Sequence, residues 1–91
     1  MDRETLERRL QQVFDADERA ARVVARQARD LFDAGSYEAD LDHELTVEVI
    51  ISNLQDAPEG YSLVDRWNWW LGALDLSHGG YEQFRVRPGA V

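Results

Sequence analysis

The sequence lacks cysteine and lysine altogether, and each absence narrows what the protein can be. Without cysteine it can form neither a disulfide framework nor a thiolate metal site. Without lysine, all ten cationic side chains are arginine, which is less strongly hydrated than lysine and pairs with carboxylates through two hydrogen bonds. Long apolar runs are also missing, and charge begins at Asp2, so neither a membrane span nor a signal peptide is expected. We therefore expect a cytoplasmic protein without a membrane partner.

Positive charge is absent from the middle third of the chain. Residues 36–65 contain no arginine but eight acids: Glu38, Asp40, Asp42, Glu44, Glu48, Asp56, Glu59 and Asp65. The net charge of the chain is −8, and it comes from this segment because the flanking segments nearly balance. Such a surface argues against nucleic-acid binding at ordinary salt, since affinity for phosphate comes from basic surface. Carboxylates keep a protein hydrated when salt screens its charges, which favours a high-salt cytoplasm. A GC-rich genome that replaces lysine by arginine is the alternative explanation.

The remaining composition predicts one small folded domain, residues 1–91. Hydrophobic residues make up 44% of the chain and aromatic residues 10%, which is too much for a disordered chain. A core built from 91 residues is marginal, and oligomerisation is a common remedy at this size.

The spacing of apolar residues predicts two helices in the first 35 residues. The apolar face of the first helix holds Leu6, Leu10, Val13 and Phe14. Asp15-x-x-Glu18 has the form of a capping box that opens the second helix, and Gly35 ends it. The inward side of the second helix is expected to hold Ala20, Val24, Ala28, Leu31 and Phe32. Two helices, or one bent helix, are favoured over one continuous coiled-coil-like helix across residues 2–34, because Asp17 and Gln27 would interrupt its apolar seam.

Two more helices are predicted after an acidic connection over residues 36–45. Residues 46–56 alternate in hydrophobicity as a strand would, but the same segment also fits helical spacing, and we predict a helix that Pro58 ends. The next helix covers residues 63–76 and is capped by Ser62.

Residues 81–87 are expected to be extended, with Phe84 and Val86 on one side, and residues 88–91 to form a flexible tail. The expected fold is therefore mainly α: a small bundle of about four helices with a short extended C-terminal segment.

Tryptophan is concentrated in one string, Trp67-Asn68-Trp69-Trp70. Trp67 and Trp70 fall on the core face of the predicted helix, together with Leu63, Leu71 and Leu74. Trp69 points roughly 100° away from Trp70 and lines up with Ala73 and Leu76 as a second apolar stripe. A helix with two apolar faces is central to its fold or shares one face with a partner, and tryptophan often anchors an interface. Central burial, an oligomer or partner interface and a ligand-stacking site are the three interpretations of this stripe.

Four arginines, Arg19, Arg22, Arg26 and Arg29, share the side of the second helix that lies opposite its apolar face. One interpretation is a stripe that binds anions or phosphates. The spacings favour a solvated face with ion pairs, because Glu18–Arg22, Arg26–Asp30 and Arg29–Asp33 are all i, i+4 pairs. Each such pair contributes about 0.3–0.5 kcal/mol.

The two histidines lie in unremarkable surroundings. His43 falls in the acidic stretch Asp40-x-Asp42-His43-Glu44, and His78 precedes a glycine pair. Neither spacing matches a metal-ligand motif, and no nucleophile, base and orienting group are placed as a catalytic set. We therefore expect no catalytic residue, no cofactor and no specific metal.

The stretch from Ala57-Pro58-Glu59-Gly60 through residues 65–72 to Gly79-Gly80-Tyr81 resembles small acidic proteins of haloarchaea. The resemblance covers roughly the last half of the chain, and the N-terminal helices add nothing to it. It implies no activity and no site, but it agrees with the expectation of a high-salt environment.

The sequence therefore favours a small helical protein that acts through protein–protein contacts, with itself as a homodimer or with another protein. The competing hypothesis is a winged-helix-like regulator that binds nucleic acid. That function would need its arginines on one face free of carboxylates, namely Arg19, Arg22, Arg26, Arg29, Arg85 and Arg87. An enzyme or small-ligand protein ranks third and would need a cleft that brings His43 or His78 to other polar groups.

Overall fold

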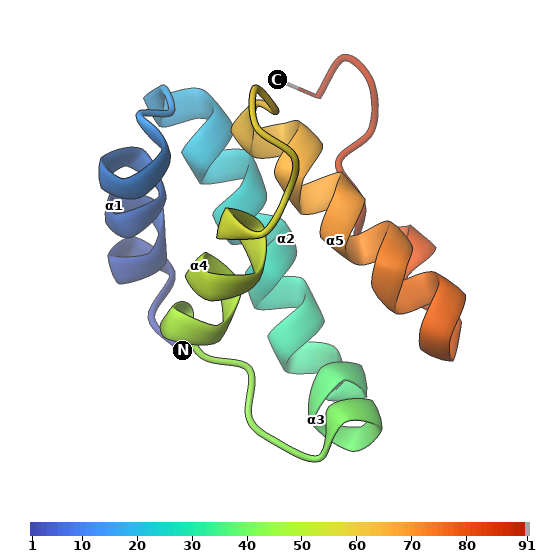
Figure 1. Cartoon of the computed structure of the whole chain (residues 1–91). Helices are drawn as coiled ribbons and strands as arrows, with labels where there is room; N and C mark the ends of the chain where they lie inside the picture. Colours follow the sequence, from blue (N-terminus) through green and yellow to red (C-terminus); the bar gives the residue numbers. More distant parts are fainter. Residues whose placement is uncertain (91) are drawn as a thin grey trace.

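Helix α2, Glu18–Ala34, lies at the centre of the structure, a computed structural model that describes residues 1–90 (Figure 1). It contacts α1 (Arg3–Phe14), α3 (Ser36–Leu41), α5 (Leu63–His78) and the 3-10 turn η1 (Glu82–Phe84). Helix α4, Val47–Gln55, contacts α1 and α5. Residues 1–90 form no strand, so the predicted mainly α bundle is confirmed. None of these helices is long and apolar enough to cross a membrane.

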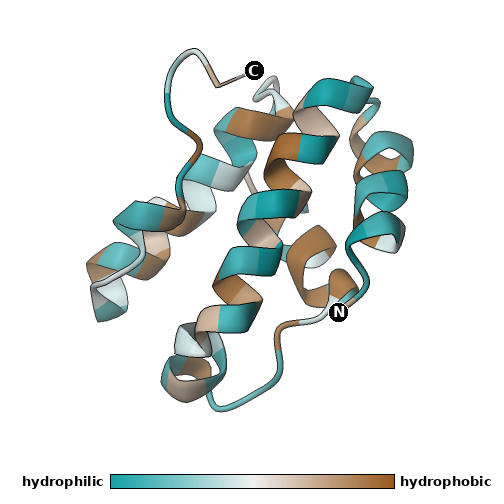
Figure 2. Cartoon of the chain, turned by 180° about the vertical axis from the view of Figure 1, so that it is seen from behind, coloured by the Kyte–Doolittle hydropathy of each residue, from teal (hydrophilic) through white to brown (hydrophobic). Residues whose placement is uncertain are grey.

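The core is built from one apolar stripe on each long helix. In Figure 2, hydrophobic segments alternate with hydrophilic ones along α2, as expected for a helix with one buried side. Small residues on that side let the neighbouring helices approach α2 closely. The buried residues of α1, α2 and α4 are Leu6, Leu10, Ala21, Val24, Ala25, Ala28, Leu31, Ile50, Ile51 and Leu54.

The prediction of two helices in the first 35 residues is confirmed, but the break between them differs from the predicted capping box. Asp15 adopts the left-handed conformation with φ 50° and ends α1. Asp17 is the true cap of α2, since its carboxylate accepts a 2.7 Å hydrogen bond from the backbone N–H of Ala20. On the inward side of α2, Ala21 and Ala25 are fully buried, whereas Ala20 and Phe32, which were predicted to face inward, are only half-buried.

The acidic connection predicted over 36–45 is wrong in part, because Ser36–Leu41 form helix α3. Tyr37 is 4% exposed and packs edge-to-face on Trp70 with ring centroids 5.8 Å apart. This aromatic contact holds the short helix against the core. The predicted helix over 46–56 is confirmed as Val47–Gln55, capped by Thr46.

The C-terminal segment is extended only in part. Helix α5 continues two residues beyond the predicted end, and the 3-10 turn η1 replaces the first part of the expected extended stretch. Phe84 and Val86, which were predicted to share one side, are both buried, while Arg87 is exposed. Of the expected tail, residues 88–90 are exposed and residue 91 lies outside the described part of the chain.

Candidate interaction surface on the last long helix

Two residues of the tryptophan string complete the core. Trp67 is fully buried and Trp70 is 5% exposed, and their rings meet edge-to-face with centroids 5.6 Å apart. The indole Nε1 of Trp67 donates a 2.9 Å hydrogen bond to the backbone oxygen of Phe84. Because a buried indole N–H needs an acceptor, this bond also determines where the C-terminal segment lies on α5.

Asn68 also holds the C-terminal segment in place, through both the nitrogen and the oxygen of its side-chain amide. Its Nδ2 donates to the backbone oxygen of Val86 at 3.0 Å, and the backbone N–H of Val86 donates to its Oδ1 at 2.8 Å. The side chain thus pairs with Val86 as a neighbouring strand would. Sequence reasoning missed this role, although asparagine inside a helix is a signal, since its amide usually prefers caps and turns.

Trp69 is the member of the string that the fold does not bury. It is 37% exposed, and its side chain makes no hydrogen bond within residues 1–90. Ala73 on the same side is exposed, and Leu76 is 91% exposed, an extreme value for a large aliphatic side chain. We call Trp69, Gly72, Ala73 and Leu76 the outer patch.

A hollow of about 430 Å³ lies against the outer patch. Besides the four patch residues it is lined by Asp75, Glu82 and Arg85. Asp75 accepts a 3.0 Å hydrogen bond from the backbone N–H of Tyr81, and Arg85 pairs with Glu82 at 3.1 Å. The charges around the hollow are therefore engaged within the chain, and its floor is apolar.

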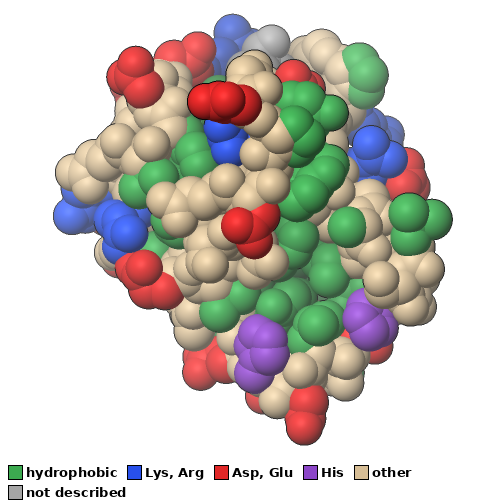
Figure 3. Space-filling view, in the orientation of Figure 1, with side chains coloured by type: hydrophobic (Ala, Val, Ile, Leu, Met, Phe, Trp, Pro, Cys, Tyr) green, Lys and Arg blue, Asp and Glu red, His purple; other side chains and the backbone are tan. Residues whose placement is uncertain are grey.

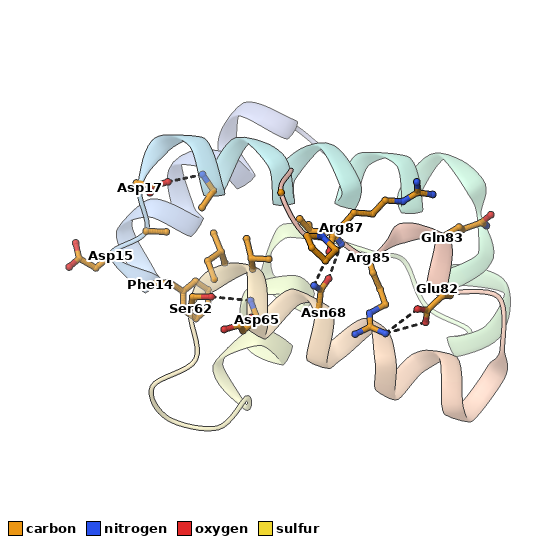
Figure 4. A pocket seen from close by; sticks show the side chains of 17 residues that line it. Phe14, Asp15, Asp17, Ser62, Asp65, Asn68, Glu82, Gln83, Arg85 and Arg87 are labelled. Carbon is orange, nitrogen blue, oxygen red and sulfur yellow. Dashed lines mark hydrogen bonds and ion pairs between the residues drawn. The ribbon is translucent and has the colours of Figure 1, made fainter. Parts of the chain in front are cut away.

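A larger groove of about 1220 Å³ shares Glu82 and Arg85 with the hollow (Figure 4). Three segments far apart in the sequence form it, at residues 14–20, 62–68 and 82–89. Asp15 and Asp17 lie at one end of the groove, and Glu82, Arg85 and Arg87 lie at the other. Its lining also includes Asp65 and apolar side chains, namely Phe14, Leu63, Val64 and Val86. The sequence could not reveal this groove, because its third wall depends on the Asn68 pairing. Among the described residues that line the groove, neither His43 nor His78 is found.

One comparison identifies the protein family of the chain. A family model described as the WNWW domain matches residues 1–75. The chain belongs to the WNWW domain family. Its name is spelled by the four residues that begin at Trp67.

The WNWW match and the resemblance seen in the sequence cover different parts of the chain. It includes helices α1 to α4, to which the resemblance did not extend, and it ends before Gly79-Gly80-Tyr81, which the resemblance included. A search of curated proteins and a search of solved structures found no match to the chain.

The arginine stripe of the WNWW domain is interleaved with carboxylates. Arg22 lies 2.8 Å from Glu18 and 3.9 Å from Glu7, and Arg29 lies 3.1 Å from Asp33. Two of the three expected i, i+4 pairs therefore form; no ion pair between Arg26 and Asp30 is found in the described chain. Arg85 is likewise paired, and Arg19, Arg26 and Arg87 are exposed. The structure thus does not gather these arginines on a face free of carboxylates.

The two histidines lie apart on one face, with hydrophobic side chains between them (Figure 3). The Nε2 atom of His43 lies 3.3 Å from the hydroxyl of Tyr37, and the His78 ring lies 6.4 Å from that of Tyr81. Among residues 1–90, no group of three or more histidines and acids is arranged to hold a metal.

Tyr81 joins α3 to the end of α5. It is fully buried, and its hydroxyl donates a 2.8 Å hydrogen bond to the carboxylate of Asp40. Burial raises the pKa of the Tyr81 phenol, and the hydrogen bond to Asp40 raises it further. Burial also raises the pKa of Tyr37. Both tyrosines therefore hold their protons more tightly in the folded chain than in the unfolded one.

Proposed function

We propose that this WNWW domain is a salt-adapted cytoplasmic protein that acts through protein–protein contacts, and that the outer patch is its contact surface. The observation that carries the proposal is that the residues of the tryptophan string differ in burial and bonding. Trp67 and Trp70 are buried and Asn68 is bonded to Val86, whereas Trp69 faces outward beside Leu76, which is 91% exposed. An exposed tryptophan within an apolar patch is a frequent anchor of protein interfaces.

Salt adaptation is supported by where the acids lie. All eight acids of residues 36–65 are exposed, and among them Glu48 has an ion pair, with Arg9. A surface of this kind stays hydrated and dispersed when salt screens it, while apolar contacts such as the outer patch keep their strength in salt. The protein would therefore combine an acidic, solvated surface with one apolar contact site, the outer patch.

Truncation of the exposed tryptophan tests the proposal. Trp69→Ala should weaken association at least about 30-fold, equivalent to about 2 kcal/mol, because it removes the anchor of the patch. The association is measured at molar KCl in two ways, by light scattering of the purified protein and by the proteins it retains from a native high-salt lysate.

Tyr61→Ala is the matched control, since Tyr61 is an aromatic residue of similar exposure, 41% against 37% for Trp69. It should leave association unchanged. If Trp69→Ala changes neither measurement and lowers the unfolding temperature as much as Trp70→Ala does, Trp69 is a core residue and the proposed contact surface does not exist.

A further inference from the structure

Gly72 is a residue that the fold of a single chain does not explain. It lies in the middle of α5, where glycine is less favourable than alanine by about 1 kcal/mol. A Cβ atom added there would meet nothing within 4 Å, so no neighbour in the chain requires its absence. Gly72 is also part of the outer patch, between Trp69 and Leu76. A glycine on an open helix face is explained when another backbone approaches that face closely.

The outer patch is complementary to itself. Leu76 projects from the surface, and the hollow runs along the same side of α5 from Trp69 to Leu76. In an antiparallel pair of identical helices, a two-fold axis between Gly72 and Ala73 sets Trp69 opposite Leu76 of the second copy. The same axis sets Gly72 opposite Ala73 of the second copy. Large side chains thus meet at the two ends, and the two small residues let the helices approach at the crossing point.

The charge distribution also favours a second copy at this place. Each chain carries −8, so most pairs of surfaces from two copies would repel each other. Around the hollow, Arg85 neutralises Glu82, and Asp75 is bonded to a backbone N–H. Asp75 keeps its charge, so the lining of the hollow carries a net charge of −1 per copy. Two such acidic chains therefore meet there with less repulsion than the total charge of −8 on each chain would suggest.

We propose that the partner of the outer patch is a second copy of the chain, in which two α5 helices cross antiparallel at Gly72 and Ala73. Leu76 of each copy enters the hollow beside Trp69 of the other. This inference rests on the proposed function, because it names the partner of the same contact surface.

The absence of cysteine gives a direct test. In the variant Ala73→Cys, the two new thiols lie next to the two-fold axis and should form a disulfide between copies on mild oxidation at molar KCl. Ser52→Cys, at another exposed small residue, on α4, is the matched control and should oxidise at least about tenfold more slowly to a dimer. Non-reducing electrophoresis measures both rates.

Gly72→Ala tests the close approach of the helices. The added methyl group meets nothing within the chain, so the unfolding temperature of the monomer should rise. It would stand between the two helices of the dimer, so the dimer dissociation constant should rise at least about tenfold. A gain in monomer stability together with a loss of dimer is a result that damage to the fold cannot produce.

Three results would overturn the inference: a wild type that is monomeric throughout at molar KCl, equal oxidation of Ala73→Cys and Ser52→Cys, or a Gly72→Ala variant that dimerises like wild type. Failure of the proposed function itself is a different result. If wild type is monomeric but retains another protein through Trp69, the second copy is wrong and the contact surface stands. If Trp69→Ala changes neither association nor retention, both are wrong.

Discussion

Asn68 shows how one polar side chain inside a helix decides the course of a distant segment. Its amide satisfies the backbone N–H and C=O of Val86, which is 4% exposed and would otherwise bury both groups without partners. Trp67 does the same for the backbone oxygen of Phe84. Three residues of the string at 67–70 therefore hold the fold together, and the remaining residue, Trp69, is exposed.

Replacing Asn68 by leucine, which has a similar shape, should release the C-terminal segment. Asn68→Leu leaves the two backbone groups of Val86 unpaired, at a cost of about 1–3 kcal/mol. The amide of Val86 should then exchange its hydrogen about 5- to 150-fold faster, the range that corresponds to this cost. Trypsin should also cut the Arg85–Val86 bond more readily. Asn53→Leu is the control, because the amide of Asn53 bonds only to Val49 within its own helix. Unchanged exchange at Val86 would show that the segment is held without Asn68.

At the scale of elements, the sequence predicted the long helices because their signals are local. Apolar spacing and the caps at Thr46 and Ser62 suffice for α4 and α5, and both caps accept the expected backbone hydrogen bonds. Helix α3 was missed because six residues form a helix only when tertiary contacts support it, here the packing of Tyr37 on Trp70.

The candidate site, like the fold, could be predicted from the sequence only in part. The outer patch was visible in the sequence, because Trp69, Ala73 and Leu76 repeat with the period of a single helix. The hollow and the groove were not, since both include residues of the C-terminal segment, whose position is decided by long-range hydrogen bonds from α5.

The link between α3 and the end of α5 should make stability fall in alkali. The pKa of Tyr81 is raised in the folded chain by burial and by its bond to Asp40, so its contribution is complete below pH about 10, the ordinary tyrosine pKa. The contribution is lost as the pH rises above that value, because the unfolded chain then loses a proton that the folded chain keeps. With no lysine and no cysteine, tyrosine is the side chain that titrates in this range.

Tyr81→Phe should therefore flatten the fall in the urea midpoint between pH about 9 and 11. Tyr61→Phe, a change at an exposed tyrosine, should leave the fall as in wild type. A Tyr81→Phe variant with the full alkaline loss would show that Tyr81 does not link α3 to α5 in solution.

For the molecule as a whole, stability should depend on salt. Eight exposed acids lie within residues 36–65, with no arginine among them, and they repel one another along the chain from α3 to the start of α5. The screening length falls from about 10 Å at 0.1 M salt to about 3 Å at 1 M, so molar KCl removes most of this repulsion. The midpoint of thermal unfolding should rise steadily over that range. Because KCl also acts on apolar surface, the decisive comparison is a variant with Glu38→Gln, Asp42→Asn and Glu44→Gln. It should be more stable than wild type at low salt and gain less from KCl. Parallel curves for the two proteins would attribute the acidic, lysine-free composition to the genome rather than to the salt in which the protein works.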